Sequence, residues 1–182
     1  WIREHLPTEL HISPQLSTYY YGFNLSRPPF KDQPGLRRAL SLVIDRERLT
    51  SAVTLLGEVP AYGWVPQGVS GYTPQQFDYA PLSYDERIRE ARELYQAAGY
   101  SAERPLEVEI RYNTGEAHNR IAVAIAAMWK QKLGVELTLN NMEWKVHTDK
   151  MQTQDFEMGR YAWCGDYNEA STFLGLYESK SD

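Results

Sequence analysis

The chain has 182 residues, of which 42% are hydrophobic and 13% aromatic, and its formal net charge is -5. This length and composition suit one globular domain with a hydrophobic core. The negative charge leaves no basic surface for a phosphate backbone, so the composition argues against a nucleic-acid partner. No apolar run approaches the roughly 20 residues that a membrane helix needs. The chain's one cysteine excludes an internal disulfide and a cysteine-cluster zinc site.

The histidines give no support for a metal site. Their spacing lacks the short repeats that are typical of metal ligands. We therefore expect no metal and no cofactor. The four residues are His5, His11, His118 and His147.

The first part of the chain predicts one strand followed by two short helices. Residues 18–25 are rich in aromatic side chains, which favours a strand. Pro34 suits the start of a helix with an apolar face. Asp45 can cap a second helix, which we expect to end at Gly57.

Residues 58–82 combine prolines and glycines with several aromatic residues, which predicts a long loop. One interpretation is an ordered connection whose rings pack on the surface of the domain. The other is that the rings form a wall of a binding cleft. The first is the more frequent structure for such a segment.

From residue 83 onward, the predicted elements alternate between helix and strand. Ser83 and Glu86 form a capping box, and hydrophobic periodicity supports the elements that follow. The order is a helix 83–99, a strand 106–112, a helix capped by Asn113 with Glu116 and ended by Gly134, a strand 135–139, a short helix 144–152 and a strand 156–163. This alternation predicts the α/β class, with a mixed, partly parallel sheet flanked by helices and ligands near the strand ends.

Residues 160–169 form the densest cluster of chemically active side chains. In extended backbone, Arg160, Cys164 and Asp166 would share one face, while Tyr161 and Trp163 would share the other. Such a cluster suits a zwitterionic peptide: Asp166 can accept hydrogen bonds from an α-ammonium, and Arg160 can bind a carboxylate. The alternative is that Arg160 and Asp166 pair with each other or with neighbouring helices.

A catalytic interpretation of the same region is much weaker. Cys164, His118 and Asp166 supply the residue types of a thiol hydrolase triad. However, free cysteines are more often buried small hydrophobes than nucleophiles. A histidine in a helix is more often a structural hydrogen-bonding residue than a catalytic base. We therefore expect no enzymatic activity.

Several motifs together resemble the family-5 extracellular solute-binding proteins of ABC importers, in particular the periplasmic oligopeptide-binding proteins. The resemblance extends over nearly the whole chain. The motifs are Tyr19-Tyr-Tyr-Gly-Phe-Asn24, Leu36-Arg-Arg-Ala-Leu-Ser-Leu-Val-Ile-Asp-Arg46, Pro60-Ala-Tyr-Gly63, Tyr112-Asn-Thr114 with His118, Met128-Trp-Lys-Gln-Lys-Leu-Gly-Val135, Glu143-Trp-Lys145 and Trp163-Cys-Gly-Asp-Tyr-Asn-Glu169.

The resemblance implies that residues 1–182 form a single α/β lobe, most of the second lobe of a two-lobed protein that closes on its ligand. Residues 1–17 are expected to form a hinge or linker segment, and both ends of the chain look truncated. The family's partners would be an oligopeptide ligand and the membrane permease. The location implied is periplasmic, or extracytoplasmic and membrane-associated in a Gram-positive bacterium, and the protein is expected to be a monomer.

The resemblance also implies roles for individual residues at the two ends of a bound peptide. Asp166 would meet the α-ammonium, and Cys164 and Trp163 would lie beside it along the peptide backbone. Arg160 and His118 would neutralise the terminal carboxylate of peptides of different lengths.

Two further residues would shape the pockets for peptide side chains. Trp144 matches an aromatic residue of a pocket wall, and Tyr161 stands where relatives can have a small residue, which would narrow a pocket. In some relatives, a cysteine at the position of Tyr20 bridges to the one matching Cys164. Since the chain has Tyr20 instead, we expect Cys164 to be a free, buried thiol.

The family name does not determine the cargo. Relatives on the same fold bind murein peptides, dipeptides, nickel complexes, haem or oligosaccharides. The presence of Asp166 together with Arg160 and His118 favours peptides.

Overall fold

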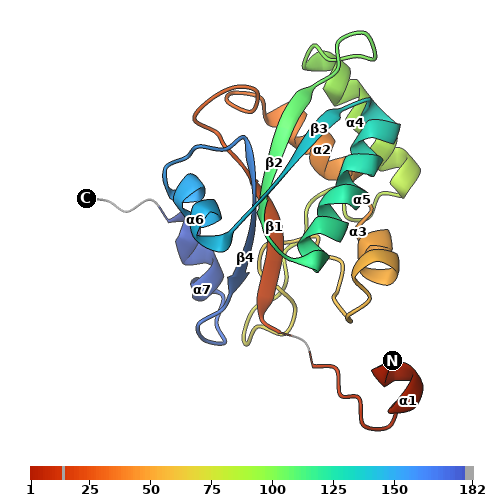
Figure 1. The fold of residues 1–182 in the computed structure, drawn as a ribbon, viewed down its shortest axis with the longest axis vertical. Coiled ribbons are helices and arrows are strands. Elements are labelled where there is room, and N and C mark those ends of the chain that lie inside the picture. Colours follow the sequence, from red (N-terminus) through yellow and green to blue (C-terminus); the bar gives the residue numbers. More distant parts are fainter. Residues whose placement is uncertain (14, 179–182) are drawn as a thin grey trace.

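The computed structural model describes residues 1–13 and 15–178 and is built on a four-stranded sheet in the order β1-β4-β2-β3 (Figure 1). The strands are β1 (Ser17–Phe23), β2 (Glu107–Asn113), β3 (Glu136–Met142) and β4 (Met158–Cys164). Strand β2 runs parallel to both β3 and β4, whereas β1 is antiparallel to β4. The predicted mixed, partly parallel sheet is therefore confirmed.

Apart from α1, which the sequence does not predict, the helices and strands follow one another in the predicted order. None of the helices in the described residues is long and apolar enough to cross a membrane. The helices are α1 (Ile2–His5), α2 (Pro34–Val43), α3 (Arg46–Arg48) with a π-helical continuation (Leu49–Thr54), α4 (Tyr84–Ala97), α5 (Glu116–Leu133), α6 (Trp144–Gln152), and α7 (Ser171–Leu174) with a 3₁₀ turn (Gly175–Tyr177).

The two crossover connections place α5 and α6 on opposite faces of the sheet (Figure 1). The connection β2-α5-β3 moves outward to the edge strand, and β3-α6-β4 moves back across β2. Because crossovers between parallel strands are almost always right-handed, reversing the direction reverses the face that the helix covers. Ligands of such sheets bind at the carboxyl ends of the strands where this reversal occurs.

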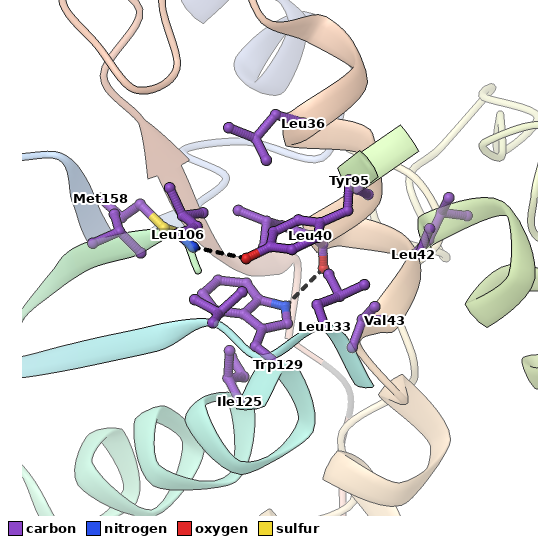
Figure 2. Close-up of a cluster of buried hydrophobic side chains, with 14 of the residues drawn as sticks. Leu36, Leu40, Leu42, Val43, Tyr95, Leu106, Ile125, Trp129, Leu133 and Met158 are labelled. Carbon is purple, nitrogen blue, oxygen red and sulfur yellow. Dashed lines mark hydrogen bonds between the residues drawn. The ribbon is translucent and has the colours of Figure 1, made fainter. Parts of the chain in front are cut away.

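The main core lies between the sheet and the helices α2, α4 and α5. Trp129 of α5 is 1% exposed, and its Nε1 donates a hydrogen bond to the carbonyl of Leu40 at 2.9 Å (Figure 2). The amide of Leu106 similarly donates to the hydroxyl of Tyr95 at 2.8 Å. Both polar groups are thus satisfied inside an apolar environment, as buried groups must be.

Most of the predicted helix ends are confirmed, but the second helix ends at Thr54 and not at Gly57. The capping box of Ser83 and Glu86 is formed, the Asp45 carboxylate accepts a hydrogen bond from the Arg48 amide, and Gly134 ends α5 with φ 78°. The left-handed conformation at Gly134 is one that glycine adopts without steric cost.

The predicted capping of α5 by Asn113 is wrong. This helix starts at Glu116 after Gly115, with no side-chain capping bond, and Asn113 is instead the last residue of β2. Its Oδ1 accepts a hydrogen bond from Nη1 of Arg160 at 3.0 Å. The side chain of Asn113 therefore binds a residue of β4 and does not cap the helix.

Aromatic residues in the loop 58–82 pack against the rest of the fold. Tyr79 is 3% exposed and belongs to the main core. Trp64 packs against a smaller cluster that contains Phe173, and its Nε1 donates to the Phe173 carbonyl at 2.8 Å. These contacts support the interpretation of an ordered connection, although Trp64 also reaches the candidate site described below.

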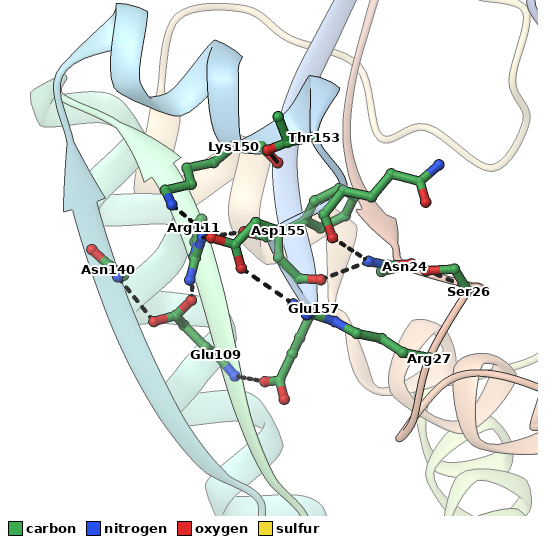
Figure 3. A network of polar contacts seen from close by, with 12 residues as sticks. Asn24, Ser26, Arg27, Glu109, Arg111, Asn140, Lys150, Thr153, Asp155 and Glu157 are labelled. Atoms are coloured by element: carbon green, nitrogen blue, oxygen red, sulfur yellow. Dashed lines mark hydrogen bonds and ion pairs between the residues drawn. The ribbon is translucent and has the colours of Figure 1, made fainter.

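A polar network lies at the end of the sheet where β4 starts (Figure 3). Arg111 of β2 contacts both Glu109 and Asp155, and Asp155 also accepts from Lys150 at 2.6 Å. The buried amide of Asn24 donates to two carbonyl groups in the turn before β4. This network ties β1, β2 and β4 together at the end of the sheet where β2 and β4 are still paired.

Candidate functional site

The predicted site residues gather at the carboxyl edge of the sheet. Strands β2, β3 and β4 all end at this edge because they are parallel, and β1 begins there because it is antiparallel to β4. The predicted residues are Arg160, Tyr161, Trp163 and Cys164 on β4, Asp166 directly after it, His118 in the first turn of α5 and Trp144 at the start of α6.

Arg160 is the centre of a group of polar and aromatic side chains. Its guanidinium carbon lies 4.7 Å from the centre of the Tyr19 ring, and its Nη1 donates to Asn113. The Tyr19 hydroxyl is 3.4 Å from Nδ1 of His118. Among the described residues, no carboxylate lies within 4.0 Å of Arg160, so the alternative of an internal ion pair is not observed. The cation can receive an external anion.

Burial and positive charge both affect the ionisation of His118. Burial lowers its pKa below the ordinary 6.5, and the charges of Arg160 and protonated His147 act in the same direction. Burial also raises the pKa of the neighbouring Tyr19. At neutral pH, the positive charge of this group therefore resides on Arg160, with His118 as a neutral hydrogen-bonding partner.

Asp166 is exposed, and its position is fixed through the backbone. Its amide donates to Oγ1 of Thr172 at 3.1 Å, and the indole of Trp163 donates to the Thr172 carbonyl at 2.8 Å. Among the described residues, the Asp166 carboxylate enters no ion pair. The loop after β4 thus presents an unpaired carboxylate at the same edge as the unpaired guanidinium.

One expectation about Cys164 is wrong. The residue is a free cysteine, but it is exposed and not buried, because it ends the strand at the open edge of the sheet. The strand register places Ser17, and not Tyr20, opposite Cys164, with its Sγ 3.4 Å from Oγ of Ser17. Tyr20 is instead paired with Tyr161.

The structure does not assemble the thiol hydrolase arrangement. The hydrogen bond of Cys164 goes to Ser17, and that of His118 goes to Tyr19. A nucleophile and its base should be hydrogen-bonded to each other. Nor does any group of three or more histidine, cysteine or acidic side chains in the described part of the chain have the geometry to hold a metal ion.

A row of aromatic rings lies on the face of β4 opposite the Arg160 side chain, because Tyr161 follows Arg160 in the strand and successive side chains point to opposite faces. Tyr161 stacks on Tyr20 with ring centres 5.7 Å apart, and the rings of Trp64 and Tyr20 meet edge-on with centres 4.8 Å apart. His147 of α6 lies 6.0 Å from Tyr161 and 6.1 Å from Trp144, which is 56% exposed. The predicted aromatic residues Tyr161 and Trp144 are thus both neighbours of the buried His147 ring.

Four residues of this site had no functional role in the sequence interpretation. The tyrosine run indicated a strand. Tyr20 was distinguished only as the position of a cysteine in some relatives, and nothing distinguished Tyr19 as a neighbour of the site. Asn113 was expected as a helix cap. No signal in the sequence could have identified His147, because its contacts depend on how α6 packs against β4.

Comparisons with known proteins agree with this fold. The chain is 44% identical over 174 residues to the periplasmic murein peptide-binding protein MppA of Escherichia coli, covering 96% of this chain and 32% of the relative. It is 38% identical over 180 residues to the periplasmic oligopeptide-binding protein OppA of the same organism, covering 99% of the chain and 33% of the relative. The chain therefore spans about a third of the length of these curated relatives.

A further relative carries a different ligand in its name. The probable deoxycholate-binding periplasmic protein YgiS of Escherichia coli is 40% identical over 181 residues, which covers 100% of this chain and 34% of that protein.

Solved structures extend the agreement to three dimensions. The structure of the Escherichia coli murein tripeptide-binding protein MppA superposes with a TM-score of 0.92 at 43% identity, over 98% of this chain and 35% of the other. The structure of Haemophilus influenzae OppA in complex with RPPGFSPFR also superposes with a TM-score of 0.92. Its sequence identity is 35%, and the match covers 99% of this chain and 36% of the other. The sequence profile of "Bacterial extracellular solute-binding proteins, family 5 Middle" matches residues 3–182, and the chain therefore belongs to this family of solute-binding proteins.

Proposed function

We propose that this chain is one lobe of the extracytoplasmic substrate-binding component of an ABC peptide importer. The whole protein would bind oligopeptides without covalent change, in a cleft between this lobe and a second one, and deliver them to the membrane permease. Supporting this role, the family consists of solute-binding proteins, and relatives that match nearly the whole chain are named for peptide binding.

The observation that carries the proposal is the pair of unpaired, opposite charges at one sheet edge. The carboxylate of Asp166 suits an α-ammonium group, and the guanidinium of Arg160 suits a terminal carboxylate. His118 and Tyr19 would add hydrogen bonds at the carboxylate end. A free peptide carries both charges, and its extended backbone can lie along β4 between them.

The residues between the two charges would contact the body of the peptide. Cys164 and Trp163 would lie along the peptide backbone near its amino end. Tyr161 and Trp144 would limit the pockets for side chains, and the stacking of Tyr161 on Tyr20 would make its pocket narrow. Selectivity would then depend on side-chain size more than on charge.

A second candidate ligand is an amphipathic carboxylate such as a bile acid. The row of rings around Tyr20 and Tyr161 could contact an apolar ring system, and one relative is named as a probable deoxycholate-binding protein. This ligand gives Asp166 no partner, because a bile acid has no ammonium group. We therefore favour peptides.

The test is mass spectrometry of the ligand that copurifies with the full-length protein under native conditions. We expect short peptides with free termini, because both charges would then be matched. Recovery of a steroid acid, a sugar or a metal chelate without peptides would contradict the proposal.

A further inference from the structure

Strands β2 and β4 separate at the candidate site, although both continue beyond their last paired residues. Their parallel pairing consists of Ile110 with Met158 and Arg111 with Gly159. Strand β2 extends to Asn113, and β4 extends to Cys164. The backbone of β4 therefore loses its neighbour on this side directly after Gly159, at the residue that carries the guanidinium.

His147 takes the place of the missing strand contact. The residue is 1% exposed, and its Nε2 lies 2.9 Å from the carbonyl oxygen of Arg160. A carbonyl can only accept, so Nε2 is the donor. This leaves Nδ1 as a buried acceptor, which has no partner among the described residues. The imidazole thus satisfies a carbonyl that would otherwise be left unpaired in the gap.

The close packing of α6 makes this contact geometrically available. A Cβ atom on Gly159 would overlap Sδ of Met151, so a larger residue there would force the Met151 side chain or the helix to move. Met151 and His147 are four positions apart in α6 and therefore face the same side of the helix. The helix is thereby held with the imidazole against the Arg160 backbone.

Arg160 is consequently held at both its ends. Its carbonyl accepts from His147, while its guanidinium donates to Asn113 and lies over the ring of Tyr19. Its Nε is buried and has no partner among the described residues. A side chain with this many internal contacts loses little freedom when it binds an anion, which favours affinity.

We propose that His147 is a positioning residue that holds Arg160, through its backbone, in the geometry that binds the terminal carboxylate of the ligand. His147 would not touch the ligand carboxylate itself. The inference rests on the proposed peptide-binding function and adds to it a residue from α6 that controls the carboxylate end of the cleft.

A purely structural role for His147 makes a different prediction. A buried ring that only filled space between Tyr161 and Trp144 would affect every ligand equally, whatever the charge at its end. A positioning role should affect ligands with a free carboxylate and spare those without one. The two roles can therefore be separated within a single variant protein.

The experiment measures the affinity of the full-length protein for trialanine, tetra-alanine and penta-alanine, each as the free acid and as the C-terminal amide, by isothermal titration calorimetry. His147→Phe keeps an aromatic ring of similar size but removes the donor. His147→Gln keeps a donor, since the amide nitrogen of glutamine can occupy the position of Nε2. Arg160→Met gives the loss of affinity for the free acids that is expected when the cation is absent.

We expect His147→Phe to weaken binding of the free acids by about 3- to 10-fold, the scale of one net hydrogen bond, and to change binding of the amides by less than about 2-fold. His147→Gln should restore most of the affinity for the free acids. Equal losses for acids and amides, or no loss for either, would overturn the role of His147 and leave the proposed function intact. Wild-type protein that binds none of these peptides would overturn both.

Discussion

Asp166 and Arg160 carry opposite charges at the same edge, but the fold holds them differently. Arg160 is half-buried and makes side-chain contacts with Asn113 and Tyr19. Asp166 is exposed, and only its backbone is tied, to Thr172. An exposed carboxylate is well solvated and gains little from a single partner in water. The contribution of Asp166 should therefore depend on closure of the cleft, which would remove the surrounding water.

We predict that Asp166→Asn weakens peptide binding by the full-length protein by about 2 to 4 kcal/mol, the scale for removing one partner of a desolvated charge pair. The change keeps the shape of the side chain and removes its charge. Calorimetric titration with trialanine measures the effect. Glu169→Gln, a nearby exposed carboxylate, serves as the matched control and should have little effect. Unchanged binding by the Asp166 variant would place the ammonium site elsewhere.

At the scale of elements, the packing of α6 against β4 determines the shape of the carboxyl edge. The two elements meet at Gly159, where Met151 occupies the space that a side chain would need. Strand β1 pairs with the other side of β4, and Gly22 lies opposite Gly159 in that register. A Cβ atom on Gly22 would meet nothing within 4 Å. The two glycines are thus neighbours with different steric requirements.

We predict that Gly159→Ala lowers the free energy of unfolding by about 1 to 3 kcal/mol, because the added methyl group overpacks the contact with Met151. Gly22→Ala is the matched control. It should be neutral or slightly stabilising, since alanine restricts the unfolded chain at no steric cost. Urea denaturation of both variants measures the difference. Equal stabilities would mean that α6 can move away from β4 freely.

At the scale of the whole molecule, the buried His147 and the half-buried His118 couple folding to pH. Burial lowers the pKa of both His118 and His147 below 6.5, and the positive charge of Arg160 contributes to each shift. The charged or titratable groups around them are Tyr19 of β1 and Arg160 and Tyr161 of β4, and each histidine also lies near the other. A histidine with a lowered pKa binds its proton more weakly in the folded state than in the unfolded state.

We predict that the two histidines make their full contribution to the free energy of unfolding above pH 6.5, and that this contribution falls as the pH drops below 6.5. In that range, the unfolded chain takes up protons that the folded chain does not, so acid favours unfolding, and the loss is complete below the lowered pKa values. Urea denaturation between pH 8 and pH 5 measures the slope. The double variant His118→Gln, His147→Gln should flatten it, whereas His11→Gln, at an exposed position, should not. An unchanged slope in the double variant would contradict the assignment.

Much of the fold could be predicted because its signals are local. The capping box at Ser83, the glycine that ends α5 and the alternation in β2 each depend on a few consecutive residues, and each was confirmed. The boundaries of α6 also agreed with the prediction. The cluster 160–169 could be identified as a candidate site because its unusual residue types are adjacent in the chain.

The tertiary structure alone decided which distant groups meet. Ser17 and Cys164 are 147 positions apart, so their pairing depends on a strand register that no local pattern specifies. Asn113 has the residue type of a helix cap, but the fold gives it to Arg160, and His147 acquires its role only because α6 packs against β4 where β2 diverges. The sequence by itself determined the elements and the chemical types at the site, since propensity and capping act within one turn or strand. Burial, register and hydrogen-bond partners arise between segments, and these determine how the charges at the carboxyl edge are held.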